Sequence, residues 1–404
     1  MMSFTKERKR EWQSGMSKTI TFIVTKDCQL ACKYCYLVGK NSKEKMSFGV
    51  AKSAIDYILS HESEMPESSV IWDFIGGEPF LEIDLIDGIC DYLKEEMFRL
   101  NHHWFNSYRF SFSTNGINYH EKKIQDFISK NRNHLSIGIT IDGTPTKHNI
   151  NRIYKNGRGS YEDVANNVAL WQKQFPGAGT KVTISSEDIP YICESVLHLY
   201  SLGISEVNIN CVFENVWKTG DDVLFEQQLL LLADKIIEQD LYRNNVCSLF
   251  SESIGKPLDR DSDNQNWCGA GMMLAVDASG NFYPCTRFAA YSLRSKKPLV
   301  IGNVYDGIKK NYLRPFLTLD RCSQSSQECI DCEVASGCAW CQGENYDTAD
   351  TSTIYQRATA ICKMHKARVR ANNYYWNKLY RKLELEGKRE EFEKNRQNVK
   401  SVIC

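Results

Sequence analysis

The sequence predicts a mixed α/β fold, a partial (β/α)6 TIM-like barrel followed by a C-terminal cysteine-rich domain. Six short, apolar, β-rich runs alternate with stretches of helical period in the first half of the chain. Ten of the 16 cysteines lie beyond Cys211 in short spacings. Repeated βα units are typical of parallel strands covered by helices. Six units are too few for an eight-fold barrel, so we expect a barrel with an open side.

The expected elements follow in chain order. The strands are Ile20–Val24, Val70–Ile75, Arg109–Ser113, Ser136–Ile141, Lys181–Ser185 and Glu206–Cys211. Ser47 precedes a helix whose apolar stripe is Val50, Ala51, Ile55, Ile58 and Leu59, and the next helix carries Ile83, Ile86, Ile89 and Leu93. Residues Asp221–Leu241 form one amphipathic helix, with Leu224, Leu231, Ala233 and Ile236 as its apolar positions.

We expect four segments along the chain. They are the barrel at residues 1–220, a bridging helix and linker at 221–267, the cysteine-rich domain at 268–365 and a helical tail at 366–404. The linker is placed at Arg260–Trp267, which is rich in Asp and Asn. The aromatic stretch at 374–380, followed by mixed charges, is more typical of a helix docked on its own protein than of a binding surface.

Composition excludes several classes of protein. Lys plus Arg equals Asp plus Glu, at 50 each in 404 residues, so no net field favours nucleic acid or an acidic membrane. No segment approaches the roughly 20 apolar residues of a membrane span, and the N-terminal stretch lacks a signal-peptide core. We therefore expect a cytoplasmic protein. In a reducing compartment, so many cysteines indicate metal ligation rather than disulfides.

The first cysteine motif follows the first strand. Cys28, Cys32 and Cys35 have C-x3-C-x2-C spacing, with the aromatic Tyr34 before the last cysteine. A cubane iron–sulfur cluster normally takes four thiolates, so three would leave one iron open to a non-protein ligand. A zinc knuckle or a set of buried thiols is the alternative. The motif resembles that of the radical SAM enzymes, which implies a 4Fe-4S cluster that binds S-adenosylmethionine, with Tyr34 against its purine.

Further candidate cofactor-binding residues fall at the ends of later strands, where parallel barrels gather their ligands. Gly76, Gly77, Glu78 and Pro79 end the second strand, and the resemblance implies that this run receives the cofactor's amino group. Ser113 and Asn115 follow the third strand and are similar to the family's ribose and carboxylate contacts. Asp142 follows the fourth strand and is alternatively a cap, while Arg152 is either a fork for the methionine carboxylate or a solvated arginine.

The radical SAM resemblance implies that electron transfer into the cofactor yields a 5′-deoxyadenosyl radical, which removes a substrate hydrogen atom. That step needs no general acid or base, and the sequence has no recognisable Ser/His/Asp arrangement. We expect His102, His103 and His365 to be ordinary surface or packing residues.

The second group of cysteines resembles the SPASM extension, which in that family binds two auxiliary 4Fe-4S clusters. By position, an outer cluster takes Cys329, Cys332, Cys338 and Cys362, and an inner one takes Cys268, Cys285 and Cys341. The family has three residues between the last pair of the central run, whereas this chain has two. Cys322 is a possible substitute or fourth ligand. A zinc ribbon is the alternative, although the five residues between the two C-x2-C pairs are far fewer than is usual. The remaining cysteines, Cys90, Cys193, Cys211, Cys247 and Cys404, are expected to be buried or free thiols.

Radical SAM proteins with this extension act mostly on peptides or proteins. The resemblance is closest to the peptide maturases that form thioether links, including the branch whose targets repeat a cysteine motif. Formylglycine formation, as in sulfatase maturases, is an alternative, but those enzymes have an aspartate directly after the cysteine equivalent to Cys285, where this chain has Thr286. Carbon–carbon cross-linking, epimerisation and a non-catalytic metal scaffold also remain alternatives.

The expected partners are a ribosomally made, cysteine-containing precursor peptide and an electron donor such as flavodoxin or ferredoxin. The first strand begins near Ile20, which leaves too little preceding chain for a leader-binding domain. We therefore expect the leader to be bound by the barrel, the C-terminal helix or a separate protein.

Overall fold

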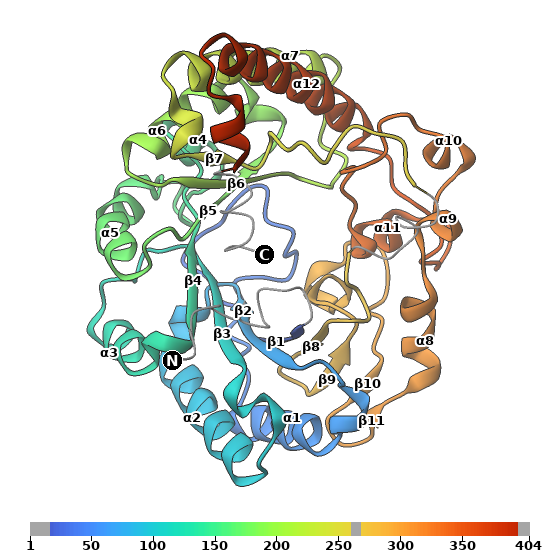
Figure 1. Cartoon of the computed structure of the whole chain (residues 1–404). Helices are drawn as coiled ribbons and strands as arrows, with labels where there is room; N and C mark the ends of the chain where they lie inside the picture. The colour runs from blue at the N-terminus through green and yellow to red at the C-terminus, as the bar shows by residue number, and fades with distance from the viewer. Residues whose placement is uncertain (1–16, 260–267, 395–404) are drawn as a thin grey trace, which may run out of the picture.

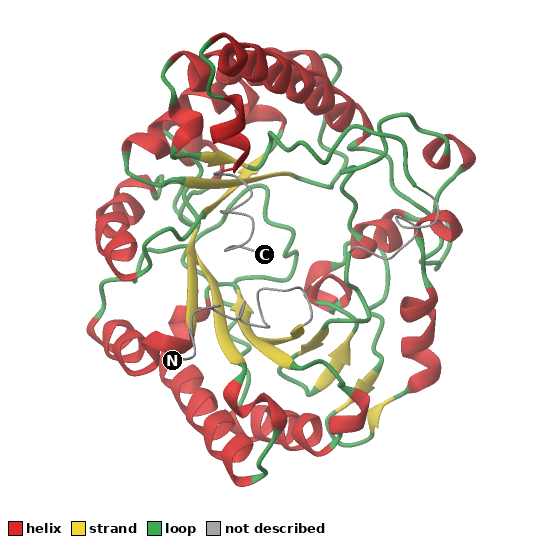
Figure 2. Ribbon diagram, viewed as in Figure 1, coloured by secondary structure: helices red, strands yellow, loops and turns green. Residues whose placement is uncertain are grey.

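The structure, a computed structural model, describes residues 17–259 and 268–394. Parallel strands curve around a central axis and helices cover their outer side (Figures 1 and 2). The six expected strands are all present, and the predicted fold class is confirmed. They are β1 (Ser17–Thr25), β2 (Ser69–Gly76), β3 (Tyr108–Thr114), β4 (Leu135–Ile139), β5 (Thr180–Ile184) and β6 (Glu206–Cys211).

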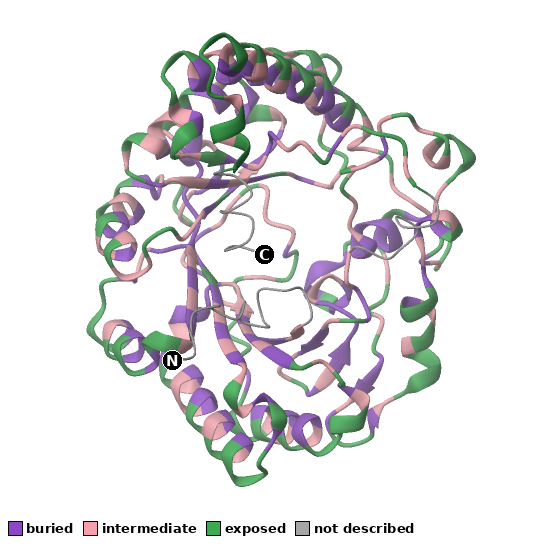
Figure 3. Ribbon diagram, in the orientation of Figure 1, coloured by how far each residue is buried: buried purple, intermediate pink, exposed green. Residues whose placement is uncertain are grey.

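Helices follow each of these strands and bury one stripe against the sheet, as Figure 3 shows. The Ser47 side chain accepts a hydrogen bond from the Val50 amide, so it caps the first helix as expected. The helices of this half are α1 (Phe48–Ser60), α2 (Ile83–Arg99), α3 (Lys122–Asn131), α4 (Pro145–Asn151), α5 (Tyr161–Gln174), α6 (Ile192–Ser201) and α7 (Asp221–Glu238).

Side chains alternate between the two faces of the barrel sheet. Phe22, Phe74 and Phe112 are in register on β1, β2 and β3 and stack in sequence on the helix side. The opposite face therefore carries polar residues at neighbouring positions. Thr21 donates to the Asp73 carboxylate at 3.2 Å, and burial raises the pKa of Asp73 to about 6.

The barrel sheet is open, and the C-terminal half of the chain extends it. Strands β1 to β4 are hydrogen-bonded in order, and β5 and β6 form a second sheet that a single parallel bridge, Thr140 to Lys181, joins to the first. On the other side of β1, strand β8 (Leu274–Val276) pairs with β1 in parallel, and further strands continue the sheet in antiparallel order. The expected boundary at residue 268 thus lies shortly before β8, the strand through which the two halves form one continuous sheet.

The C-terminal half consists of short strands, short helices and one long helix. Its elements are β7 (Val246–Cys247), β8 (Leu274–Val276), β9 (Asn281–Tyr283), β10 (Gly302–Asn303), β11 (Gly307–Ile308), α8 (Lys310–Thr318), α9 (Arg321–Gln324), α10 (Gln327–Ile330), α11 (Gln342–Thr348) and α12 (Cys362–Leu385).

The C-terminal helix α12 docks along α7, as its aromatic stretch predicted (Figure 1). Asp234 of α7 accepts hydrogen bonds from Tyr374 at 2.7 Å and from Lys378 at 2.6 Å. Tyr375 is buried and stacks on Phe250 with 4.4 Å between ring centroids. These contacts fix the tail helix to the outside of the barrel.

The predicted apolar stripe of α7 is right at Ala233 and Ile236, which are buried, and wrong at its two leucines. Leu231 of α7 is 46 % exposed and Leu224 only partly buried, because the buried stripe lies about one position away along the helix. It consists of Phe225, Leu229, Leu232, Ala233, Ile236 and Ile237. The predicted linker at 260–267 lies outside the described residues. Within the residues that are described, no helix is both long and apolar enough to cross a membrane.

Candidate active site

The loop after β1 brings the first three cysteines to the carboxyl end of the barrel strands. Cys28 is buried, and Cys32 and Cys35 are half-buried. Two backbone hydrogen bonds tie this loop to the end of α4 and the residues that follow it, from Ala31 to the Ile153 carbonyl at 2.7 Å and from Lys33 to that of Asn151 at 3.0 Å. The cysteine loop is therefore held at two points rather than left free.

The two glycines at the end of β2 are required by contact with the cysteine loop. The amide of Gly77 donates to the Thr25 carbonyl at 2.9 Å, and that of Glu78 donates to the Asp27 carbonyl at 2.8 Å. A Cβ atom on Gly77 would lie 2.1 Å from the Asp27 carbonyl oxygen, and one on Gly76 would lie 2.4 Å from that of Thr25. Any other residue would push the cysteine loop away from β2.

The Glu78 side chain connects the ends of β2 and β3. It is 1 % exposed, and its carboxylate accepts from the Phe80 amide at 3.1 Å, the Thr114 hydroxyl at 2.6 Å and the Asn115 amide at 2.7 Å. Pro79 is buried beside it, whereas Ser113 is exposed at the end of β3. The carboxylate of Glu78 is thus occupied by protein donors, so it connects the ends of β2 and β3.

Asn115 connects the end of β3 to the cysteine loop. Its amide nitrogen donates to the Gln29 side chain at 3.0 Å and lies 3.9 Å from the Cys28 sulfur. Burial, followed by the charge of Glu78, raises the pKa of the Cys28 thiol to about 12.

One hydrogen-bonded network joins Tyr34, which is half-buried, to the buried Asp142 and Arg152. The Tyr34 hydroxyl donates to Asp142 at 2.5 Å and accepts from Arg152 at 3.0 Å. The other Asp142 oxygen accepts from the Thr183 amide at 3.1 Å, and the helix that follows is capped by Thr144 rather than by Asp142. Arg152 is 6 % exposed, so it is not a solvated arginine, and its Nε is buried without a protein partner.

The residues at the ends of β1 to β4 suit the group that the sequence predicts for them, a 4Fe-4S cluster that binds S-adenosylmethionine. Among the described residues, no three cysteine sulfurs lie within 4.8 Å of one another. Tetrahedral zinc, with bonds of about 2.3 Å to sulfur, would bring three sulfurs within roughly 4 Å of one another, and the described cysteines do not show that arrangement. Lys40 donates to the Cys32 carbonyl at 3.3 Å, and although burial raises the pKa of the Cys32 thiol, the charges of Arg152 and Lys40 oppose that rise. The free Nε of Arg152 is a donor available to an anionic ligand.

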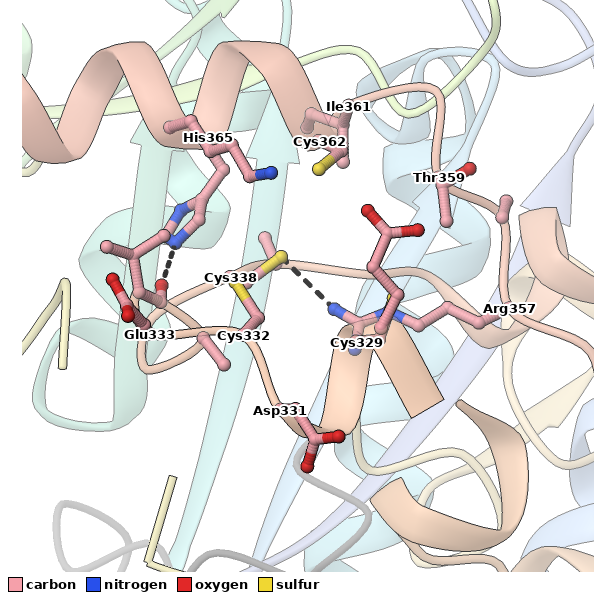
Figure 4. Close-up of a pocket in the computed structure, with 16 residues that line it drawn as sticks. Cys329, Asp331, Cys332, Glu333, Cys338, Arg357, Thr359, Ile361, Cys362 and His365 are labelled. Atoms are coloured by element: carbon pink, nitrogen blue, oxygen red, sulfur yellow. Dashed lines mark hydrogen bonds between the residues drawn. The ribbon is translucent and has the colours of Figure 1, made fainter. Parts of the chain in front are cut away.

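The outer group of cysteines surrounds a cavity of about 430 Å³ in the C-terminal half. Cys329, Cys332, Cys338 and Cys362 all line it, with Cys362 at the start of α12 (Figure 4). Arg357 donates to the Cys338 sulfur at 3.1 Å. The four predicted members of this group are therefore brought together around one space.

The inner group lies on three separate segments. Burial raises the pKa of the Cys285 thiol, and the next largest causes are the charges of Cys341 and Cys268, which places these three sulfurs near one another. Cys322 lies in α9, beside Arg321, which donates to the carbonyl oxygens of Ala335 and Cys338. The remaining thiols match the expectation of burial at Cys90, Cys193 and Cys247, while Cys211 is half-buried and Cys404 lies outside the described residues.

The three predicted histidines are surface or packing residues, as expected, since His102 and His365 are buried and His103 is exposed. Glu62, His102 and His103 are the one group of possible metal ligands found within 4.8 Å among the described residues. However, Nδ1 of His102 accepts from the Trp104 amide at 3.2 Å, so in the neutral ring Nε2 carries the hydrogen and cannot bind a metal. His365 contacts the Val334 carbonyl at 2.6 Å.

Sequence reasoning missed a second cavity beside the cysteine loop. It measures about 370 Å³, and its lining includes Tyr34 and Cys35 from that loop, Glu214 and Lys218 from the segment after β6, and Arg294 from the C-terminal half. Glu214 follows a barrel strand, which is the position that identified the other candidates. No motif marked it, because its partner is distant in sequence.

Comparison with known proteins agrees with this geometry. Residues 22–185 match the family model described as the radical SAM superfamily. An uncharacterized protein of Methanocaldococcus jannaschii is 26 % identical over 294 residues, which is 72 % of this chain and 89 % of that protein. A serine-type anaerobic sulfatase-maturating enzyme of Bacteroides thetaiotaomicron is 21 % identical over 305 residues, covering 69 % of this chain and 70 % of that one.

Solved structures share the fold. The structure described as native anSMEcpe with bound AdoMet has a TM-score of 0.66 at 19 % identity and covers 89 % of this chain and 99 % of that chain. SuiB of Streptococcus suis, solved with its precursor peptide SuiA, has a TM-score of 0.55 at 14 % identity and covers 85 % of this chain and 75 % of its own.

Proposed function

We propose that this protein modifies a ribosomally made, cysteine-containing precursor peptide. The premise is that the chain contains a radical SAM domain and is an enzyme of that chemistry. The modification is a thioether link from a cysteine sulfur to a carbon of another residue. The observation that carries this proposal is the 370 Å³ cavity, which is bounded by the first cysteine loop and by Arg294 of the cysteine-rich half.

In this proposal Cys28, Cys32 and Cys35 hold the cluster that binds S-adenosylmethionine. When bound, the cluster and S-adenosylmethionine together would supply the 5′-deoxyadenosyl radical that removes a hydrogen atom from the peptide. Tyr34 and Arg152 orient the cofactor, Asp142 fixes Tyr34, and Glu78 holds the ends of β2 and β3 against the cysteine loop. The remaining residues proposed to face the cofactor are Gly76, Gly77, Pro79, Ser113 and Asn115.

In this proposal seven of the cysteines in the C-terminal half, the outer four and the inner three, hold two auxiliary 4Fe-4S clusters. The outer four surround their own cavity, and the inner three leave one coordination position for a thiolate from the peptide. The proposed electron donor is flavodoxin or ferredoxin. The leader of the precursor peptide is proposed to bind to the barrel, to α12 or to a separate protein.

Thioether formation is tested by alkylation. Incubating the reconstituted enzyme with S-adenosylmethionine, a reductant and a cysteine-bearing precursor peptide should give a product that has lost a pair of hydrogens for each link. Each modified cysteine should resist iodoacetamide even after strong reduction, since a thioether, unlike a disulfide, is not reduced. Peptide incubated without S-adenosylmethionine is the control. A product whose cysteines are all alkylated would overturn the thioether and leave carbon–carbon cross-linking or epimerisation.

Formylglycine formation is the second candidate, because anaerobic sulfatase-maturating enzymes share the fold. The residue directly after Cys285 is Thr286, which has no carboxylate. We expect no aldehyde from a sulfatase-derived cysteine or serine peptide, as measured by hydrazine trapping and mass spectrometry. Efficient aldehyde formation would replace the thioether proposal with sulfatase maturation.

A further inference from the structure

Glu214 is a carboxylate held at the wall of the cavity beside the cysteine loop. It lies in the segment after β6, and its side chain is 14 % exposed. The other charged residues of the cavity are Lys33, Glu187, Lys218 and Arg294. Lys33 lies 3.9 Å from Glu187, and both side chains are more than half exposed, so Glu214 is the more buried acid of the two.

Arg287 fixes the position of Glu214. Its Nη2 lies 2.9 Å from the Glu214 carboxylate and 3.0 Å from that of Glu344. Arg294 in turn contacts Glu344 at 2.5 Å and Asp347 at 3.2 Å. Two guanidinium groups thus face three carboxylates, and the network has one more negative than positive charge. Glu344 and Asp347 are each 3 % exposed, whereas Glu214 reaches the cavity.

The network also places Glu214 between the two cysteine sites. Cys35 lines the same cavity, and Arg287 lies two residues after Cys285. The guanidinium of Arg287 packs over the ring of Tyr36, 4.5 Å from its centroid, and Tyr36 is the residue after Cys35. A peptide thiol in this cavity would therefore lie beside Glu214 and near both the first cysteine loop and the inner group.

We propose that Glu214 accepts the proton of the substrate cysteine thiol. The sulfur–hydrogen bond breaks, the proton moves to a carboxylate oxygen of Glu214, and the electron pair stays on sulfur as a thiolate. This inference rests on the proposed function. No carboxylate follows Cys285, and the segment after β6 supplies one from a different part of the chain.

The surrounding charges suit that step. Lys218 and Arg294 line the cavity, and cations near a thiol favour its thiolate. Arg287 keeps the Glu214 carboxylate in one orientation, while burial, followed by the charge of Glu214, raises the pKa of Glu344. Proton transfer by a positioned side chain contributes about 10²-fold to 10⁴-fold to a rate.

The test is the pH dependence of thioether formation by Glu214→Gln. The variant should be slower by about 10²-fold at pH 7. As pH rises, the ratio of the wild-type rate to the variant rate should fall about tenfold per pH unit. It should level off near the substrate thiol's own pKa of about 8.5, because the thiolate then forms without the base. Glu214→Asp, which keeps a carboxylate, and Glu187→Gln, which changes the exposed acid of the same cavity, should both keep the wild-type pH dependence. Iron content of each variant verifies folding.

Two outcomes separate this inference from the function on which it rests. A Glu214→Gln rate that is lowered equally at every pH, or not lowered at all, while the wild type forms thioether, would overturn the role of Glu214 alone. Absence of thioether from the wild-type enzyme would overturn the proposed function and this inference with it.

Discussion

Replacing Cys28, Cys32 and Cys35 together by alanine should abolish reductive cleavage of S-adenosylmethionine. The triple variant should also lose about 4 irons per chain out of about 12, because three 4Fe-4S clusters are proposed and one is held by this loop. The auxiliary groups lie on other segments, so their spectra should remain. Iron is measured after anaerobic reconstitution, and cleavage is followed as 5′-deoxyadenosine by chromatography.

A matched control is Cys90→Ala. Cys90 is fully buried in α2 and belongs to neither cysteine group, so its loss should leave iron content and cofactor cleavage unchanged. Colourless protein that retains tightly bound zinc after native purification would contradict the iron assignment for both halves of the chain.

The barrel strands could be predicted because each is a short apolar run bounded by turn residues. The sharing of a sheet by the two halves could not, since β8 has three residues and its pairing with β1 joins positions about 250 apart. Two leucines of the predicted α7 stripe, Leu224 and Leu231, were misplaced for a related reason. Several leucines at 229–232 are compatible with more than one helical face, and the contacts of α6 and α12 decide which is buried.

In the candidate site, too, local features could be predicted from the sequence, whereas contacts between distant residues could not. Spacing along the chain identified the cysteines and the strand-end residues, and the structure gathers the first three cysteines and the strand-end residues at one end of the barrel. What the individual side chains do depends on partners distant in sequence. Glu78 meets Asn115, Tyr34 meets Asp142, and Glu214 meets Arg287, which is 73 positions away. No local pattern carries such information.

Replacing Glu78 by alanine should have the largest effect on stability of any change in the site outside the cysteines. It would leave the buried Phe80 amide, Thr114 hydroxyl and Asn115 amide without their acceptor. An unsatisfied buried donor costs about 1–3 kcal/mol, so we expect the free energy of unfolding to fall by about 3 kcal/mol or more. Because the same side chain holds β3 beside the cysteine loop, iron bound by that loop should fall with it.

Glu78→Gln and Glu82→Ala separate this hydrogen-bonding role from a general effect of charge. The glutamine keeps the shape and one carbonyl acceptor, so its loss of stability should be smaller than that of alanine. Glu82 lies four residues later and pairs with the exposed Lys45 at 3.1 Å, a contact worth at most about 1 kcal/mol. Anaerobic denaturation with iron analysis measures all three variants. If Glu78→Ala unfolded at the wild-type denaturant concentration with full iron, Glu78 would not be what holds β2 and β3 against the cysteine loop.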